Sequence, residues 1–121
     1  MILLSAPEQY TMLTCDEKAN ICNGCGAKGG ISVPNTFYGL DISEACNIHD
    51  FRYFMGETWP DKEFADKEFH NNLIAIIEHE TWFNWLANLR KVRALEYVTA
   101  VRLWGDNAYR AGKGLKPRNN K

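Results

Sequence analysis

The feature that most constrains this fold is the spacing of its apolar residues, which recur every three to four positions from about residue 43 to residue 109. This spacing is typical of helices that bury one stripe, whereas strands would alternate every second residue. No strand pattern of comparable strength occurs. The sequence therefore predicts an all-α fold, and its 121 residues suffice for a single domain, 1–121, with one core.

Two central helices are expected to carry the core. The first spans about 43–56, because Asp41 or Ser43 can cap its start. The second spans about 60–79, with Pro60 at its first position, where the missing N–H has no helical partner to lose. The connection between them is short, which favours antiparallel packing.

A long C-terminal helix is expected over about 82–109, with a break near Gly105. The core candidates of the second helix are Ala65, Phe69, Leu73, Ile76 and Ile77. Those of the C-terminal helix are Leu86, Leu89, Val92, Leu95, Tyr97, Val98, Val101 and Trp104. A polar, basic tail follows at 112–121, and we expect it to fray.

The stretch 15–41 is expected to be irregular and to follow a short helix or arm within residues 1–14. It is punctuated by Gly24, Gly26, Gly29, Gly30, Pro34, Asn35 and Gly39. Loops of this length are uncommon in compact domains unless they serve a function or are held by a disulfide or an ion. The part from about 22 to 41 is therefore a candidate binding loop.

Four cysteines, Cys15, Cys22, Cys25 and Cys46, allow two disulfides in three connectivities. An alternative is a zinc site made by the first three cysteines with either Cys46 or His49, which a reducing compartment would favour. Against zinc, the second half of the site lacks a paired CxxC or HxxxH motif.

The string from Cys46 to Tyr53, which reads Cys-Asn-Ile-His-Asp-Phe-Arg-Tyr, contains the candidate catalytic residues. Asp66 falls on the apolar stripe of the next helix, where a carboxylate is costly unless it is hydrogen-bonded, and His49 is the partner that an antiparallel neighbour supplies. Such a carboxylate fixes the imidazole tautomer, so that the other ring nitrogen can deprotonate a water. Tyr53, one turn after His49, can donate to the same carboxylate.

Asp50 points about 100° away from His49 and so serves a different purpose. The glycine-rich loop is the obvious neighbour, since glycines let backbone carbonyls turn inward. Calcium prefers carboxylate and carbonyl oxygens, and a cation there would polarise a substrate carbonyl and hold an oxyanion. Taken singly, each residue has a simpler explanation: a satisfied core histidine for His49, a solvated carboxylate on a slightly rotated helix for Asp66, and core filling for Tyr53. The loop, the string and the acid together, however, form one mechanism.

Three motifs resemble those of secreted-type phospholipase A2, above all its small bacterial and phage-type members. They are Cys25-Gly26-Ala27-Lys28-Gly29-Gly30, the string from Cys46 to Tyr53, and Asp66-Lys67-Glu68-Phe69. They match the calcium loop, active-site helix and second helix of that family, over about residues 22–77. Ala45 and Ala65 stand where larger members of the family have cysteines.

The resemblance implies that His49 activates water, that Asp66 orients it and that Tyr53 donates a supporting hydrogen bond. It assigns Ca²⁺ to Asp50 and to the loop carbonyls of Gly24, Gly26 and either Gly29 or Lys28. The third carbonyl has two candidates because this loop has one residue more than the family pattern between Gly26 and Gly29. It also implies a disulfide between Cys25 and Cys46 that tethers this loop to the helix, and leaves Cys15 and Cys22 as a second bridge.

The implied activity is calcium-dependent hydrolysis of the sn-2 ester of glycerophospholipids, with a phospholipid membrane surface as substrate. Exposed aromatic residues such as Phe37, Tyr38 and Trp59 are candidates for meeting that surface, or for the core. The alternative is a non-catalytic, phospholipase-like module that binds lipid or another protein.

Charge is unevenly distributed, with 5 Lys/Arg against 13 Asp/Glu in residues 1–81 and 9 against 2 in residues 82–121. We expect the two halves to complement each other within one fold, and no nucleic-acid partner, because no basic motif is interleaved with aromatics. No apolar run is long enough for a signal peptide or a membrane span. We therefore expect secretion or virion association by a route that needs no signal peptide, or otherwise a cytoplasmic location.

Overall fold

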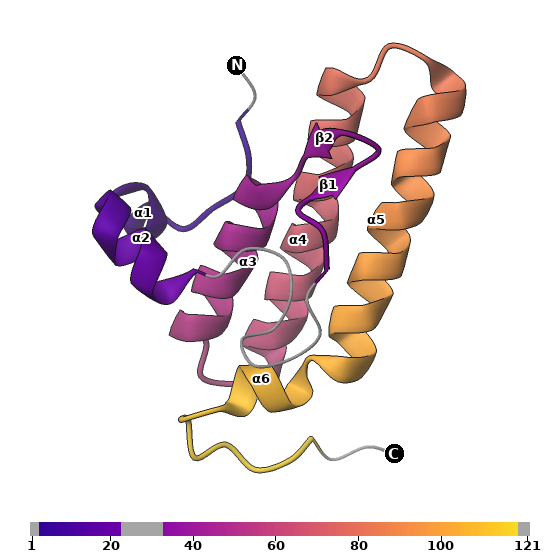
Figure 1. The fold of residues 1–121 in the computed structure, drawn as a ribbon. Helices are drawn as coiled ribbons and strands as arrows, with labels where there is room; N and C mark the ends of the chain where they lie inside the picture. Colours follow the sequence, from indigo (N-terminus) through magenta and orange to yellow (C-terminus); the bar gives the residue numbers. More distant parts are fainter. Residues whose placement is uncertain (1–2, 23–32, 119–121) are drawn as a thin grey trace.

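Three long helices form the body of the molecule in a computed structural model that describes residues 3–22 and 33–118. They are α3 (Ser43–Met55), α4 (Trp59–Glu80) and α5 (Asn84–Trp104), and α4 lies between the other two (Figure 1). Within the described residues the chain is mostly helical, with one small sheet. The predicted mostly helical fold with two neighbouring central helices is confirmed.

The ends of α3 and α4 have local causes. Thr58 caps α4 through a reciprocal pair of hydrogen bonds with Asp61, a capping box that satisfies two helix-end groups. The helix begins at Trp59, one residue before the expected Pro60. Gly56 follows α3 where a Cβ atom would lie 2.5 Å from the Tyr109 hydroxyl oxygen, so any larger residue would push α3 away from the C-terminal segment.

The main core lies between α4 and its two neighbours. All five apolar residues predicted for the stripe of α4 are buried or nearly so. On α5 the prediction is wrong in part, because Leu89, Val92, Leu95 and Trp104 are exposed while Tyr97 and Val98 are buried. The helix is rotated so that Arg90 and Ala94 face inward instead.

The rotation of α5 is fixed by a small hairpin made of β1 (Thr36–Phe37) and β2 (Leu40–Asp41), which pair antiparallel. Arg90 donates to the backbone oxygens of Phe37 and Tyr38, at 3.0 and 2.7 Å. The turn has two successive residues with positive φ, Tyr38 at 48° and Gly39 at 83°, as tight hairpins require. Phe37, considered as a surface aromatic, is 1% exposed and belongs to the core.

The N-terminal segment is more ordered than the sequence suggested. After α1 (Glu8–Thr11), α2 (Cys15–Ile21) forms a helix where residues 15–41 were expected to be irregular. The cause is a capping box, in which the side chain of Thr14 accepts from Glu17 N–H and the Glu17 side chain accepts from Thr14 N–H. Such a box satisfies backbone donors early enough to start a helix in a polar segment.

The residues before α1 form an arm that is pinned to α4. Ser5 and Asn72 exchange two hydrogen bonds of 2.8 Å, and the Ser5 hydroxyl donates to Glu68. Glu68 is buried and also accepts both donors of a forked Arg52 side chain from α3. The arm therefore seals the α3–α4 interface at one side.

The C-terminal helix breaks at Gly105, as predicted, and continues as α6 (Asp106–Arg110). The described part of the tail does not fray as expected. Trp59 donates its indole N–H to the Lys116 carbonyl at 3.1 Å, and Arg118 pairs with Glu63 at 3.1 Å. The ion pair between Arg118 of the tail and Glu63 of α4 is an instance of the charge complementarity expected between the two halves.

Among the helices of residues 3–22 and 33–118, none combines enough length and apolar character to cross a bilayer.

Candidate active site

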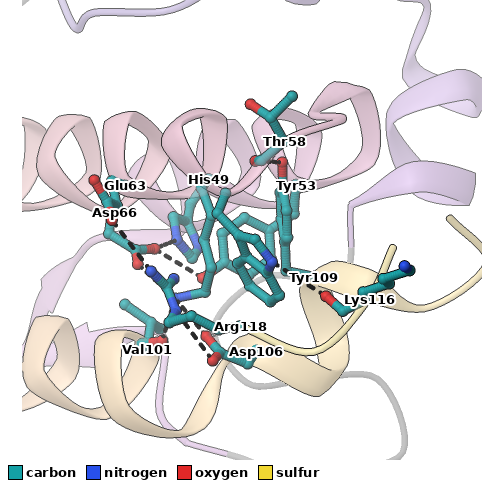
Figure 2. Close-up of polar contacts among 12 residues, drawn as sticks. His49, Tyr53, Thr58, Glu63, Asp66, Val101, Asp106, Tyr109, Lys116 and Arg118 are labelled. Carbon is teal, nitrogen blue, oxygen red and sulfur yellow. Dashed lines mark hydrogen bonds and ion pairs between the residues drawn. The ribbon is translucent and has the colours of Figure 1, made fainter. Parts of the chain in front are cut away.

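The site is centred on the seam between α3 and α4, where a histidine and a tyrosine from one helix meet a carboxylate from the other (Figure 2). His49 Nε2 lies 2.8 Å from Asp66 Oδ1, and the Tyr53 hydroxyl donates to the same oxygen at 2.7 Å. His49 is 6% exposed and Asp66 is 2% exposed. The structure therefore brings together the three residues that the sequence suggested for catalysis.

The imidazole of His49 packs against two aromatic rings. It stacks on Phe69 at a centroid distance of 4.5 Å and lies 4.2 Å from the ring of Tyr53. With Nε2 donating to an ionised Asp66, the neutral ring carries its lone pair on Nδ1. No described residue hydrogen-bonds Nδ1, the nitrogen that would act as proton acceptor.

The Asp66 carboxyl stays ionised despite its burial. Burial raises its pKa, but hydrogen bonds from His49, Lys62 and Tyr53 favour the anion, and the pKa lies below its ordinary value. Burial and the neighbouring Asp66 charge raise the pKa of Tyr53, so its phenol keeps its proton and acts as a donor. The protonation states thus match a carboxylate that accepts and a tyrosine that donates.

Lys62 is the residue that the sequence interpretation missed. Its Nζ lies 2.8 Å from Asp66 Oδ2, 3.0 Å from the Val101 carbonyl oxygen and 3.4 Å from Asp106 Oδ1. The residue is buried, with 1% of its side chain exposed. One signal was available, since Lys62 precedes Asp66 by four residues and so lies on the same buried stripe of α4.

Asp50 occupies a different side of α3 and is half-buried. Burial, and then the Asp50 carboxylate, raise the pKa of the Cys22 thiol to about 11. Cys22 is the last described residue before the glycine-rich segment. Of the other proposed calcium ligands, Gly24, Gly26, Gly29 and the alternative Lys28 lie outside the described residues. Within those residues, no cluster of three His, Cys, Asp or Glu side chains is suited to a metal.

The cysteines follow only part of the expected pattern. Cys46 is disulfide-bonded, and its proposed partner Cys25 lies outside the described residues. The second bridge is wrong, because Cys15 and Cys22 are free thiols. They stand at opposite ends of α2, about 10 Å apart along its axis, beyond the reach of a disulfide or of a shared zinc ion.

A cavity of about 590 Å³ lies on yet another side of α3. It is lined mainly by apolar side chains, including Leu4, Tyr10, Ile48 and Ile76. Ile48 and His49 point about 100° apart on the helix, so this cavity does not open onto the imidazole. It is separate from the candidate catalytic group.

Comparison with protein-family models, with curated proteins and with solved structures gives no match. The function is therefore argued from the residues and their geometry.

Proposed function

We propose that this protein is a calcium-dependent phospholipase A2, which hydrolyses the sn-2 ester of glycerophospholipids at a membrane surface. The observation that carries the proposal is the hydrogen bond from His49 Nε2 to a buried Asp66, with Tyr53 on the same oxygen. This arrangement directs the basic nitrogen away from the carboxylate, as a water-activating base requires.

In the proposed reaction, His49 Nδ1 takes a proton from a water as the water oxygen attacks the ester carbonyl carbon. Asp66 stabilises the imidazolium that results, and Tyr53 keeps the carboxylate in place. The tetrahedral intermediate then collapses, and the imidazolium returns its proton to the oxygen of the departing lysophospholipid. The products are a fatty acid and a lysophospholipid.

Water is the nucleophile that the residues favour. Cys22, a free thiol near this helix, donates to the Asn47 carbonyl oxygen at 3.2 Å. Burial raises its pKa to about 11, so little thiolate exists near neutral pH. A cysteine-dependent acyl-enzyme route would need a more acidic and more accessible thiol.

The calcium part of the proposal rests on Asp50 and on the resemblance described above. Asp50, with the backbone carbonyls of Gly24, Gly26 and either Gly29 or Lys28, would hold Ca²⁺. The ion would supply positive charge to polarise the ester carbonyl. A disulfide from Cys25 to Cys46 would tie that loop to α3.

The test is release of fatty acid from vesicles of a phosphatidylcholine with different chains at sn-1 and sn-2, with calcium or with chelator. We expect only the sn-2 chain to be released, only with calcium, and a loss of activity in His49→Gln. The matched control is His79→Gln, an exposed histidine on α4. Full activity in His49→Gln contradicts the proposal, and vesicle binding without any hydrolysis favours the non-catalytic module.

A further inference from the structure

Lys62 sits where three helices meet, and each donor of its ammonium has an oxygen nearby. The oxygens are Asp66 Oδ2 of α4, the Val101 carbonyl oxygen near the end of α5 and Asp106 Oδ1 of α6. A buried ammonium is costly unless charges and hydrogen bonds compensate it. The three oxygens provide that compensation, so Lys62 is buried as a cation.

The cation belongs to a chain of alternating charges. Asp66 and Asp106 lie on either side of Lys62. Arg118, labelled in Figure 2, then donates to Asp106 Oδ2 at 3.3 Å and pairs with Glu63. Asp106 Oδ1 is buried and, among the described residues, has only the 3.4 Å ion pair with Lys62. The chain links the tail to the carboxylate that contacts His49.

The two oxygens of Asp66 have separate partners. Oδ1 accepts from Tyr53 and contacts His49 Nε2, while Oδ2 accepts from Lys62. Rotating the carboxylate would break bonds on both sides at once. Since Lys62 contacts the oxygen that His49 does not use, it fixes which oxygen faces the imidazole.

The corner between α5 and α6 is shaped around this arrangement. Val101 O also accepts the Gly105 backbone N–H at 2.9 Å, and a Cβ atom at Gly105 would lie 2.9 Å from the Tyr53 hydroxyl oxygen. A larger residue at Gly105 would therefore push against both the carbonyl partner of Lys62 and the donor to Asp66. Because of this close fit, the corner between α5 and α6 helps to hold Lys62 and Tyr53 in place.

We propose that Lys62 is a positioning residue, whose ammonium keeps Asp66 ionised and in the one orientation that directs His49 Nδ1 toward substrate water. The proposal deepens the phospholipase A2 assignment and, for its catalytic consequence, rests on it. Lys62 does not touch the substrate; it acts through Asp66. The α5–α6 corner supplies the carbonyl and the second carboxylate that keep Lys62 in place.

The test compares Lys62→Met with Lys67→Met, because Lys67 is an exposed lysine on the same helix. We expect Lys62→Met to lower kcat by roughly 10- to 100-fold with an unchanged KM, as when a catalytic group is displaced by a fraction of an ångström. Lys67→Met should keep both constants. A folded Lys62→Met variant with wild-type kcat overturns the proposal.

A second variant covers the case in which Lys62→Met does not fold. The double variant Lys62→Met/Asp106→Asn removes one positive and one negative charge, so the buried cluster keeps its net charge. A cooperative thermal unfolding transition is the check that this variant is folded. We expect the same loss of kcat. Wild-type kcat in this folded variant would equally overturn the proposal.

An NMR measurement separates this proposal from the assignment of activity. The ¹⁵N shifts of the His49 ring at about pH 8 should show the Nε2–H tautomer in wild type and in Lys67→Met, and a mixture of tautomers in both Lys62 variants. If wild type releases no fatty acid but the tautomer changes in this way, the phospholipase assignment fails and the positioning role stands. An unchanged tautomer in both Lys62 variants refutes the positioning role.

Discussion

Two sides of α3 differ in what supplies their polar groups. On one side, His49 and Tyr53 meet Asp66 and Lys62, all of them side chains carried by helices and held within hydrogen-bond distance. On another side lies Asp50, the one side-chain ligand in a proposed calcium site whose other ligands are backbone carbonyls. The difference teaches that the proposed base is organised by helix packing, whereas the proposed cation would depend on the path of a loop. Substitutions on the two sides should therefore have different consequences.

The largest effect on stability should come from Asp66→Asn. The substitution leaves the buried ammonium of Lys62 without its closest anion, and removing one member of a buried pair costs about 3–5 kcal/mol. Urea unfolding measures this loss. The control is Glu78→Gln, whose exposed pair with Lys91 is worth at most about 1 kcal/mol. Equal losses of unfolding free energy in the two variants would contradict the view that buried side-chain contacts organise the Asp66 side of α3.

The same comparison has a pH dependence with a definite sign. The pKa of Asp66 is lowered in the folded protein, since hydrogen bonds from His49, Lys62 and Tyr53 outweigh the opposing effect of burial. The resulting stability is complete above the unfolded pKa of about 4 and is lost as pH falls through the folded value. The stability difference between wild type and Asp66→Asn, measured by urea unfolding, should shrink below about pH 4; a difference that grows there contradicts it.

On the side of α3 that carries Asp50, the expected effect on stability comes from the binding and removal of calcium. A ligand at 100 times its dissociation constant stabilises a protein by about 2.7 kcal/mol, so calcium should raise the melting temperature of wild type. Asp50→Asn should abolish this rise, and Asp16→Asn, which neutralises an acidic residue in the first turn of α2, should keep it. A calcium-induced rise that survives in Asp50→Asn would place the cation elsewhere.

Tyr53→Phe should have a smaller effect that is confined to the helix side. It removes one hydrogen bond to an ionised group, worth about 1.5 kcal/mol here because Asp66 Oδ1 keeps its contact with His49. We expect a modest loss of unfolding free energy and of kcat, and unchanged stabilisation by calcium. Tyr38→Phe, at a tyrosine that is 55% exposed, is the control for stability and should leave the unfolding free energy unchanged.

The smallest effect should come from Arg118→Ala, at the far end of the charge chain. Its ion pairs with Glu63 and Asp106 are partly exposed to solvent, and such pairs contribute about 0–1 kcal/mol. Thermal unfolding in low and high salt should show a slight loss that salt diminishes further. A loss as large as that of Asp66→Asn would mean that the tail, rather than Lys62, sets the stability of the cluster.

Much of the helix side could be predicted because its signals are local. The burial of Asp66 follows from its place among the apolar residues of α4, and the two helices that face each other follow from a short connection. Lys62 lies on the same stripe, but lysines are almost always exposed, and its burial depends on an α5–α6 corner formed by distant residues. A side chain whose partners lie far along the chain leaves no local pattern.

The remaining errors have similar physical causes. The capping box at Thr14 and Glu17 was readable, but the nearby glycines dominated the interpretation of residues 15–41. On α5 two apolar stripes competed, and the inward one is selected by the hydrogen bonds of Arg90 to the hairpin and to Thr81. Periodicity alone cannot choose between two stripes of one helix.

The bond from Lys62 to the Val101 carbonyl spans 39 residues, which bears on how the protein is made. His49 and Asp66 are 17 residues apart and can meet while the chain is still being synthesised. The other two oxygen partners of Lys62, from Val101 and Asp106, can reach it only after α5 and α6 have left the ribosome. A nascent chain halted before Val101 would expose a charged lysine on an otherwise apolar surface, and that charge would disfavour premature closure of the core.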